Sequence, residues 1–213
     1  MNTKKTYLIS LLLTLTGHYS FGQEKSKFTY YFEDPIQVDS SSTIIIPTRY
    51  NGDFVPSKSK FSIWNIYANI FFYDFNTDSV KKLFDKDTYI VEFSGSHNET
   101  LSGINIKKHI NSVTTKWLFY TVKNIDNNKN GHIDYNDPAI LYVSDIHGEN
   151  LKALTTEKEN VVGIDIFENH NFALIKIQRD LDNDRNFDIG DKGFYFVKLN
   201  LTTLTTSKKI EAK

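Results

Sequence analysis

The chain has 213 residues, a formal net charge of −1 and no cysteine. So weak a charge favours neither nucleic acid nor an anionic membrane surface as a partner. Without cysteine, the chain has no disulfide, no thiolate metal site, no cysteine nucleophile and no lipid anchor on a cysteine side chain. Its stability must therefore come from its core or from another device such as a bound metal.

The N-terminus has the three parts of a secretory signal in their usual order. Two lysines among the first five residues are followed by an apolar run at 7–15, which is too short to span a bilayer, since that takes roughly 20 residues. Ser20 and Gly22 are the small residues that precede a cleavage site. The sequence therefore predicts a signal peptide over 1–22 and an exported protein, periplasmic or extracellular. No other stretch is apolar enough to cross a membrane.

Residues 23–213 form one predicted all-β domain. Phe, Tyr, Ile, Thr and Val are abundant, and helical spacing of apolar residues is absent over windows of about 11 residues. Strand patterns occur at 28–32, 42–47, 69–75, 88–93, 117–123, 139–145, 161–167, 172–178 and 193–199. Short strands separated by polar turns predict antiparallel hairpin repeats, propeller-like with about four small blades or an incomplete propeller. A β-sandwich is the alternative. We expect loops and a weaker strand over 94–115, and a frayed tail over 208–213.

An internal repeat supports this prediction. Residues 126–143 align with 180–197, and each copy reads strand, acidic loop, strand when the preceding strand is included. A partial copy at 70–83 aligns with 141–154 and has the hairpin without the acidic loop. The acidic loop is therefore not needed for the hairpin, which indicates that it has an additional role.

The segment LYVSDIHGENLKALT, residues 141–155, carries a specific turn pattern. Its first strand ends at Asp145, its turn contains Gly148 and Asn150, and its second strand closes in Leu154 and Thr155. This pattern resembles a blade of the TolB-type β-propellers. The resemblance implies a propeller-like hairpin in a bacterial exported protein, and it implies no particular activity.

The stretch DNNKNGHIDYND, residues 126–137, has the spacing of a calcium loop. Such a loop takes side-chain oxygens from positions 1, 3, 5 and 12, a backbone carbonyl from position 7, and often a water held by position 9. Gly at position 6 permits the sharp turn, and an apolar residue at position 8 anchors the loop. The predicted ligands are Asp126, Asn128, Asn130, the carbonyl of His132, Asp134 and Asp137.

The second acidic loop, DLDNDRNFDIGD at 180–191, has the same spacing and more charge. Its five carboxylates repel one another unless a cation lies among them, and Ca²⁺ is a hard cation that tolerates irregular oxygen coordination. Arg185 takes the place of the turn glycine, which costs backbone strain. The predicted ligands are Asp180, Asp182, Asp184, the carbonyl of Asn186, Asp188 and Asp191.

Both loops end in Asp at position 12, where calmodulin-like hands carry Glu. In this they resemble the dockerin-type loop, but Pro138 and the apolar residues after it continue as a strand where dockerins have a helix. The resemblance therefore implies the ligand loop alone, without the dockerin fold or its cohesin partner. We expect one or two Ca²⁺ ions, each closing a long connection at the tip of a β-hairpin. The alternative is a pair of solvated turns, because Asp, Asn and Gly also favour turns without a metal.

The predicted function is that of an exported calcium-binding β-repeat protein with a binding or scaffolding role at the cell envelope. Its partner would be a protein or a glycan. Two alternatives stay open: a carbohydrate-active hydrolase with structural calcium, and a calcium-dependent adhesion module. An enzyme is the less favoured interpretation, because the sequence lacks both the GxSxG nucleophile pattern and the HExxH zinc pattern.

Overall fold

The computed structural model of the chain describes residues 30–38, 41–51, 66–93, 98–101, 104–107 and 116–211. Apart from one turn of 3-10 helix, η3 (Glu168–His170), every regular element in these ranges is a β-strand. All strand pairs in this part of the chain are antiparallel. The predicted all-β, antiparallel class is confirmed. The predicted signal peptide lies outside the described residues.

The strands follow the predicted segments closely. They are β1 (Tyr30–Phe32), β2 (Ile36–Gln37), β3 (Thr43–Tyr50), β4 (Tyr67–Asp74), β5 (Ser79–Lys82), β6 (Tyr89–Phe93), β7 (Asn98–Leu101), β8 (Ile104–Lys107), β9 (Trp117–Lys123), β10 (Ile140–Asp145), β11 (Lys152–Ala153), β12 (Asn160–Phe167), β13 (Phe172–Gln178), β14 (Phe194–Asn200) and β15 (Thr206–Ile210). Each of the nine predicted strands is present. The expectation of a frayed tail is wrong for residues 208–210, because β15 pairs with β14. Every residue of β15 is exposed, so the strand has no apolar alternation by which to recognise it.

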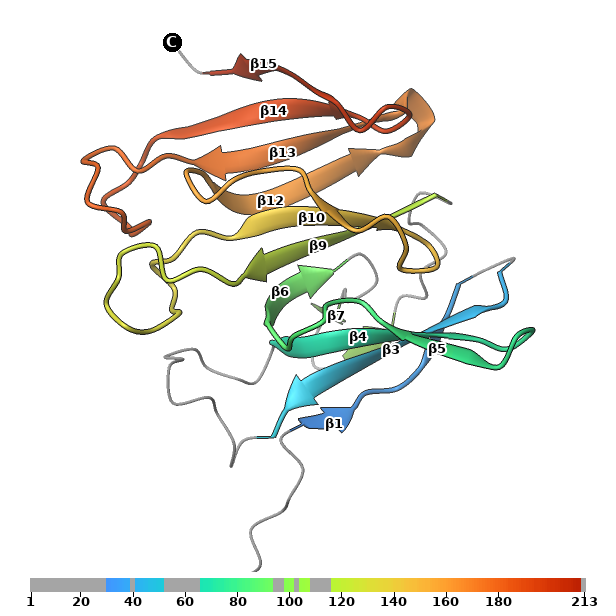
Figure 1. Cartoon of the computed structure of the whole chain (residues 1–213). Coiled ribbons are helices and arrows are strands. Elements are labelled where there is room, and N and C mark those ends of the chain that lie inside the picture. The colour runs from blue at the N-terminus through green and yellow to red at the C-terminus, as the bar shows by residue number, and fades with distance from the viewer. Residues whose placement is uncertain are drawn as a thin grey trace, which may run out of the picture.

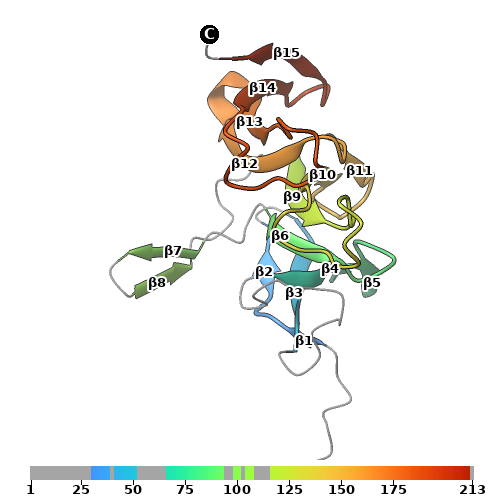
Figure 2. The ribbon, with the colours of Figure 1, turned by 90° about the vertical axis from the view of Figure 1, so that its left-hand side faces the viewer.

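Backbone pairing gives a nine-stranded sheet, a four-stranded sheet and the two-stranded β7–β8 pair. We divide the nine-stranded sheet into the N-terminal sheet, β1 to β5, and the middle sheet, β6, β9, β10 and β11, and we call β12 to β15 the C-terminal sheet. In Figure 1 these three follow one another in chain order. The first two are joined through β4 and β6, whose pairing consists of the single pair Tyr67 and Ile90. In Figure 2 the separate β7–β8 hairpin stands away from this stack.

The core lies between the sheets in two layers. Strand β9 contributes to both: Leu118, Tyr120 and Val122 pack toward the N-terminal sheet, and Phe119 packs toward the C-terminal sheet. Residues on both faces of this strand are buried, which explains why its sequence, WLFYTVK, is apolar almost throughout instead of alternating. Burying one such large side chain contributes about 1.5–3 kcal/mol.

The described strands do not close into a ring. They form the nine-stranded sheet in its two parts, the C-terminal sheet and the β7–β8 pair, where about four blades or an incomplete propeller were expected. Each end sheet of the stack has one face in the core and one face directed away from it. The propeller-like arrangement therefore stays a prediction, while the antiparallel hairpin architecture is established.

The partial repeat is present in the backbone hydrogen bonds. In the β4–β5 hairpin, Leu83 N–H donates to Ile70 O at 2.9 Å, and in the β10–β11 hairpin, Leu154 N–H donates to Leu141 O at 2.7 Å. These are equivalent residues of the aligned copies at 70–83 and 141–154.

In the described part of the chain, no helix is long and apolar enough to span a membrane.

Candidate metal-binding loops

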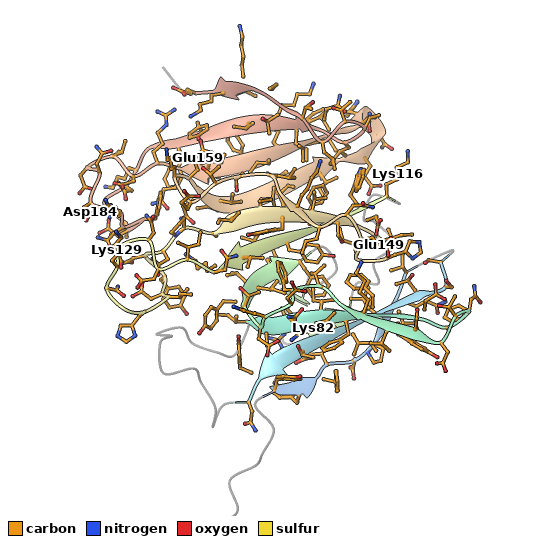
Figure 3. All side chains as sticks on the ribbon, viewed as in Figure 1. Lys82, Lys116, Lys129, Glu149, Glu159 and Asp184 are labelled. Carbon is orange, nitrogen blue, oxygen red and sulfur yellow. The ribbon has the colours of Figure 1, made fainter. Side chains whose placement is uncertain are left out.

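The two acidic loops leave equivalent positions of neighbouring sheets. Loop 126–137 connects β9 to β10 in the middle sheet, and loop 180–191 connects β13 to β14 in the C-terminal sheet. Both emerge at the same edge of the stack, where Lys129 of the first loop lies close to Asp184 of the second in Figure 3. The repeat thus places two loops of the same length side by side.

Three hydrogen bonds join the loops directly. Asn128 Nδ2 donates to Asn186 Oδ1 at 2.7 Å, and Asn127 Nδ2 donates to the Arg185 carbonyl at 3.1 Å. A backbone bond of 2.8 Å runs from the Phe187 N–H to the carbonyl of Asn136. The loops therefore form one unit that bridges the middle and C-terminal sheets.

In the first loop, the side chains of the predicted ligands accept hydrogen bonds from the loop backbone. Asp126 accepts the N–H groups of positions 5 and 6, at 3.1 and 2.9 Å. Asn128, Asn130 and Asp134 each accept the N–H two residues further on, at 3.0, 2.8 and 3.0 Å. Asp137, which is fully buried, accepts the N–H groups of positions 2 and 9, both at 2.8 Å. The loop consequently wraps around its own side-chain oxygens.

The second loop repeats five of these seven hydrogen bonds at the equivalent positions. Asp180 accepts the N–H of position 6 at 2.9 Å, and Asp191 accepts the N–H of position 2 at 2.7 Å. Asp182, Asp184 and Asp188 each accept the N–H two residues further on, at 3.2, 2.7 and 2.6 Å. The two sequences differ in charge at positions 3 and 5, yet the loops adopt one conformation because Asn and Asp oxygens accept the same bonds.

The backbone of the loops turns at equivalent places. Position 4 has positive φ in both loops, 60° at Lys129 and 61° at Asn183. Position 6 does as well, with 86° at Gly131 and 71° at Arg185. The predicted strain at the missing glycine is therefore real, since a non-glycine residue with positive φ costs about 1–2 kcal/mol.

The apolar residues at position 8 both face inward. Phe187 is buried, with 5 % of its surface exposed. Ile133 is half-buried and packs against a small cluster of buried residues from the N-terminal and middle sheets, made of Tyr50, Ile66, Ala68 and Tyr89. The loops are thus anchored to the stack at the point that the calcium-loop pattern predicts.

Two residues outside the calcium-loop pattern, one at the end of the strand before each loop, donate hydrogen bonds to loop carbonyls. Lys123, at the end of β9, is buried and donates from Nζ to the Tyr135 carbonyl at 3.0 Å and to the Asp137 carbonyl. Gln178, at the end of β13, donates from Nε2 to the carbonyls of Asp188 and Asp191 at 2.8 and 3.0 Å. Both side chains thus bind the carbonyl of position 12. A polar residue that ends an apolar strand directly before an acidic loop is the sequence signal that could have identified them.

The charges of the two loops are balanced differently. Burial of Lys123 lowers its pKa to about 8, although the carboxylates of Asp137 and Asp134 oppose this shift. In the second loop the corresponding residue is the neutral Gln178. The hydrogen bond from the Asp184 N–H lowers the pKa of Asp182, but burial and three neighbouring carboxylates together leave it above the ordinary value. The three neighbours are Asp184, Asp191 and Asp180.

Three of the predicted ligands in the second loop converge. Oxygen atoms of Asp180, Asp182 and Asp184 all lie within 4.8 Å of one another. Oδ1 of Asp180 is buried and accepts no hydrogen bond from any residue that the structure describes. An oxygen of this kind is costly unless it has a partner. Asp188 and Asp191 lie in the same loop outside this group of three, with Asp191 buried beside the strand ends.

In the first loop, amides stand where the second loop has carboxylates. Asn128 and Asn130 replace Asp182 and Asp184, so Asp126 has no acidic neighbours at positions 3 and 5. At position 7, His132 and Asn186 contribute a backbone carbonyl to the predicted ligand set. The side chain of Asn186 is already engaged, because its Nδ2 donates to Asp184 at 2.8 Å and its Oδ1 accepts from the first loop.

The comparisons with known proteins identify no family. No protein-family model matches the sequence, and no curated protein matches it. Among solved structures, the crystal structure of Porphyromonas gingivalis dipeptidyl peptidase 4 is similar, with 11% identity, 86% of this chain covered and a TM-score of 0.39. The chain spans 31% of the length of that protein. A TM-score this low supports no inference about activity. What the fold defines is an all-β protein of stacked antiparallel sheets with two paired acidic loops.

Proposed function

We propose that the chain is an exported calcium-binding β-repeat protein whose two paired loops hold one or two Ca²⁺ ions. The observation that carries the proposal is Asp180 Oδ1, which lies buried beside the carboxylates of Asp182 and Asp184 and has no hydrogen-bond partner in the described part of the chain. A carboxylate oxygen in this position lacks the partner that a cation would supply. The residues present therefore fit a metal ion.

The chemistry of the loops favours calcium among the available cations. All predicted ligands are carboxylate, amide or carbonyl oxygens, which are the donors that hard cations take. The loops are irregular and partly exposed, and Ca²⁺ accepts such geometry, whereas Mg²⁺ demands a near-ideal octahedron. Burial and repulsion from neighbouring carboxylates together raise the pKa of Asp182, and a divalent charge would relieve the repulsion.

Calcium would act here as a structural device. One loop belongs to the middle sheet and the other to the C-terminal sheet, and they contact each other through Asn128 and Asn186. An ion that fixes either loop therefore supports the contact between the middle and C-terminal sheets. This role suits an exported protein that has no disulfide to stabilise it. The surface that the loops present would then serve binding or scaffolding at the cell envelope, toward a protein or a glycan.

A thermal melt of residues 23–213, first in EDTA and then in millimolar calcium, tests the proposal. A ligand whose free concentration is 100 times its dissociation constant adds about 2.7 kcal/mol to the free energy of unfolding. For a domain of this size, each 1 kcal/mol raises the melting temperature by about 2–4 °C. We expect calcium to raise the melting temperature, and Asp180→Ala and Asp126→Ala each to remove part of the increase.

The matched control is Glu157→Ala, which removes an exposed carboxylate far along the chain from both loops. This variant should respond to calcium as the unsubstituted protein does. Magnesium at the same concentration should give a smaller increase. If calcium changes the melting temperature of none of the proteins, the loops are solvated turns and the proposal is wrong.

A further inference from the structure

The outer face of the C-terminal sheet, directed away from the core, is apolar. Residues 173, 175 and 177 of β13 point into the core, so their neighbours in the strand point outward. Phe194 is 46 % exposed, Phe167 40 % and Ile210 53 %. The ring of Phe167 stacks on that of Phe172, with centroids 4.9 Å apart. The apolar residues of this outer face are Phe167, Phe172, Leu174, Phe194, Phe196 and Ile210.

Two lysines lie over the rings of this outer face. Lys176 Nζ is 5.1 Å from the centroid of Phe194, and Lys198 Nζ is 4.6 Å from the centroid of Phe172. Both lysines are exposed and come from the same outward-facing rows of β13 and β14. The same face also carries the exposed carboxylate of Asp165, which lies opposite Leu174 in the strand pairing. The outer face therefore combines aromatic area with two lysines and one carboxylate.

The N-terminal sheet, at the opposite end of the stack, also has an apolar outer face. Phe32 is 62 % exposed and Val80 65 % exposed, and the rings of Phe32 and Phe71 meet edge to face at 5.7 Å. Strand pairing places Ile44, Tyr73 and Val80 in one row, and Ile46 and Phe71 in the next. The two end sheets pack on opposite faces of β9, through Tyr120 and through Phe119, so their outer faces point away from the middle sheet in different directions.

The outer face of the N-terminal sheet carries a carboxylate, that of Asp78. Tyr73 donates its hydroxyl to Asp78 Oδ1 at 3.1 Å, and this hydrogen bond raises the pKa of Tyr73. Lys82, in the row of Phe71, is neutralised by Asp87 at 2.8 Å. The Asp78 carboxylate and the exposed ring of Phe32 are therefore complementary to the two lysines of the opposite outer face.

We propose that the outer face of β12–β14 in one copy packs on the outer face of β3–β5 in a second copy of this chain. Within the chain, sheets stack by burying the same kinds of side chain, Phe, Tyr, Ile and Leu, between antiparallel strands. Two unlike, complementary apolar faces at the two ends of one stack continue that arrangement between copies. Contacts between unlike surfaces form rings or filaments, and two copies can satisfy both ends at once if the rotation closes.

The test is the mass in solution, measured by light scattering after size-exclusion chromatography in millimolar calcium. The protein is expressed with its own N-terminal segment, so that any cleavage takes place in the cell. We expect a mass of two copies or more that falls on dilution. Val80→Lys and Phe194→Lys each add a charge to one outer face, and each should raise the dissociation constant at least about tenfold. Val91→Lys, at a 39 % exposed position of the middle sheet, is the matched control and should leave the mass unchanged.

A mixture of the two variants separates this contact from its alternatives. Val80→Lys retains the outer face of β12–β14, and Phe194→Lys retains that of β3–β5, so the mixture should associate where each variant alone is monomeric. Association of Val80→Lys alone at the strength of the unsubstituted protein would mean a contact between like faces and would overturn the proposal. A mixture that stays monomeric would do the same.

Two further outcomes also overturn the proposal. One is an unsubstituted protein that is monomeric up to near-millimolar concentration. The other is a monomer that binds phosphatidylglycerol vesicles through Phe194, which would assign the outer face to a membrane surface. Circular dichroism and a thermal melt check that each variant is folded. Phe32→Lys and Phe167→Lys replace the first pair if either fails to fold.

Discussion

Asn128 and Asn186 join the two acidic loops through a 2.7 Å hydrogen bond between side chains that are 58 residues apart in the sequence. Each residue belongs to the predicted ligand set of its own loop, so the bond connects the two candidate sites. Together with the backbone bond from Phe187 to Asn136, it makes the conformation of one loop depend on the other. The loops are therefore expected to respond as a pair.

A double-mutant cycle measures this dependence. We expect the effects of Asn128→Ala and Asn186→Ala to be non-additive, with an interaction energy of about 0.5–1.5 kcal/mol. Either substitution alone breaks the bond between the two side chains, so the double variant does not lose it a second time. Urea denaturation of the four proteins at fixed calcium gives the energies. Effects that add within about 0.3 kcal/mol would mean that the loops are independent.

The second prediction concerns position 6 of the loops. Arg185 has φ of 71° where the first loop has Gly131 at 86°. Arg185→Gly should raise the free energy of unfolding by about 0.5–1 kcal/mol at saturating calcium, because relief of strain exceeds the entropy that glycine gains in the unfolded chain.

Gly131→Ala is the matched control for this prediction. A Cβ at this position has no atom within 4 Å, so its effect reports backbone conformation alone. It should lower stability by about 1 kcal/mol. Urea midpoints measure both variants, and an unchanged or lower midpoint for Arg185→Gly would contradict the argument from strain.

The third prediction is a pH dependence that originates at Lys123. Burial lowers its pKa to about 8 in the folded chain, from 10.5 for the free side chain. Between these values the unfolded chain binds more protons, so stability rises with pH in this window. Relative to Lys123→Gln, the free energy of unfolding of the unsubstituted protein should rise by on the order of 1 kcal/mol from about pH 7.5 to 9.5.

The substitution Lys123→Gln is chosen because Gln178 has the corresponding place below the second loop. Urea denaturation is measured for both proteins at several pH values and one calcium concentration. The series ends below about pH 10, since burial raises the pKa of Tyr50 and stability that depends on neutral tyrosine is lost above that range. Parallel curves for the two proteins would rule out Lys123 as the source.

The fourth prediction concerns the contact between the first two sheets. Gly148, in the β10–β11 turn, has φ of 72°, and a Cβ there would lie 2.4 Å from the ring of buried Phe72 in β4. Gly148→Ala should therefore lower the free energy of unfolding by about 2–4 kcal/mol, from overlap and backbone strain together.

Gly163→Ala provides the comparison, since a Cβ at that glycine meets no atom within 4 Å and its φ is not in the left-handed range. It should be neutral or stabilising by up to about 1 kcal/mol. Chemical denaturation of both variants gives the difference. Equal effects of the two substitutions would mean that the turn does not pack against Phe72 as described.

Local patterns in the sequence determined the strands and the conformation of the loops. Strands such as 172–178 alternate between a core face and an outer face, so their period is visible without any knowledge of neighbours. In the loops, most of the Asp and Asn oxygens accept hydrogen bonds from backbone N–H groups two to five residues further on, as Asp180 does from position 6. Bonds of this range depend on residue type and spacing alone, which is why both loops could be aligned position by position.

The tertiary structure alone decided which of these elements meet. The stacking of three sheets brings the loops together through Asn128 and Asn186, and it buries Lys123 beneath the first loop. It also makes a strand of the fully exposed 206–210, because β14 offers an edge with which that segment can pair. Contacts between residues this far apart depend on how the twisted sheets pack, and no spacing in the sequence encodes that packing.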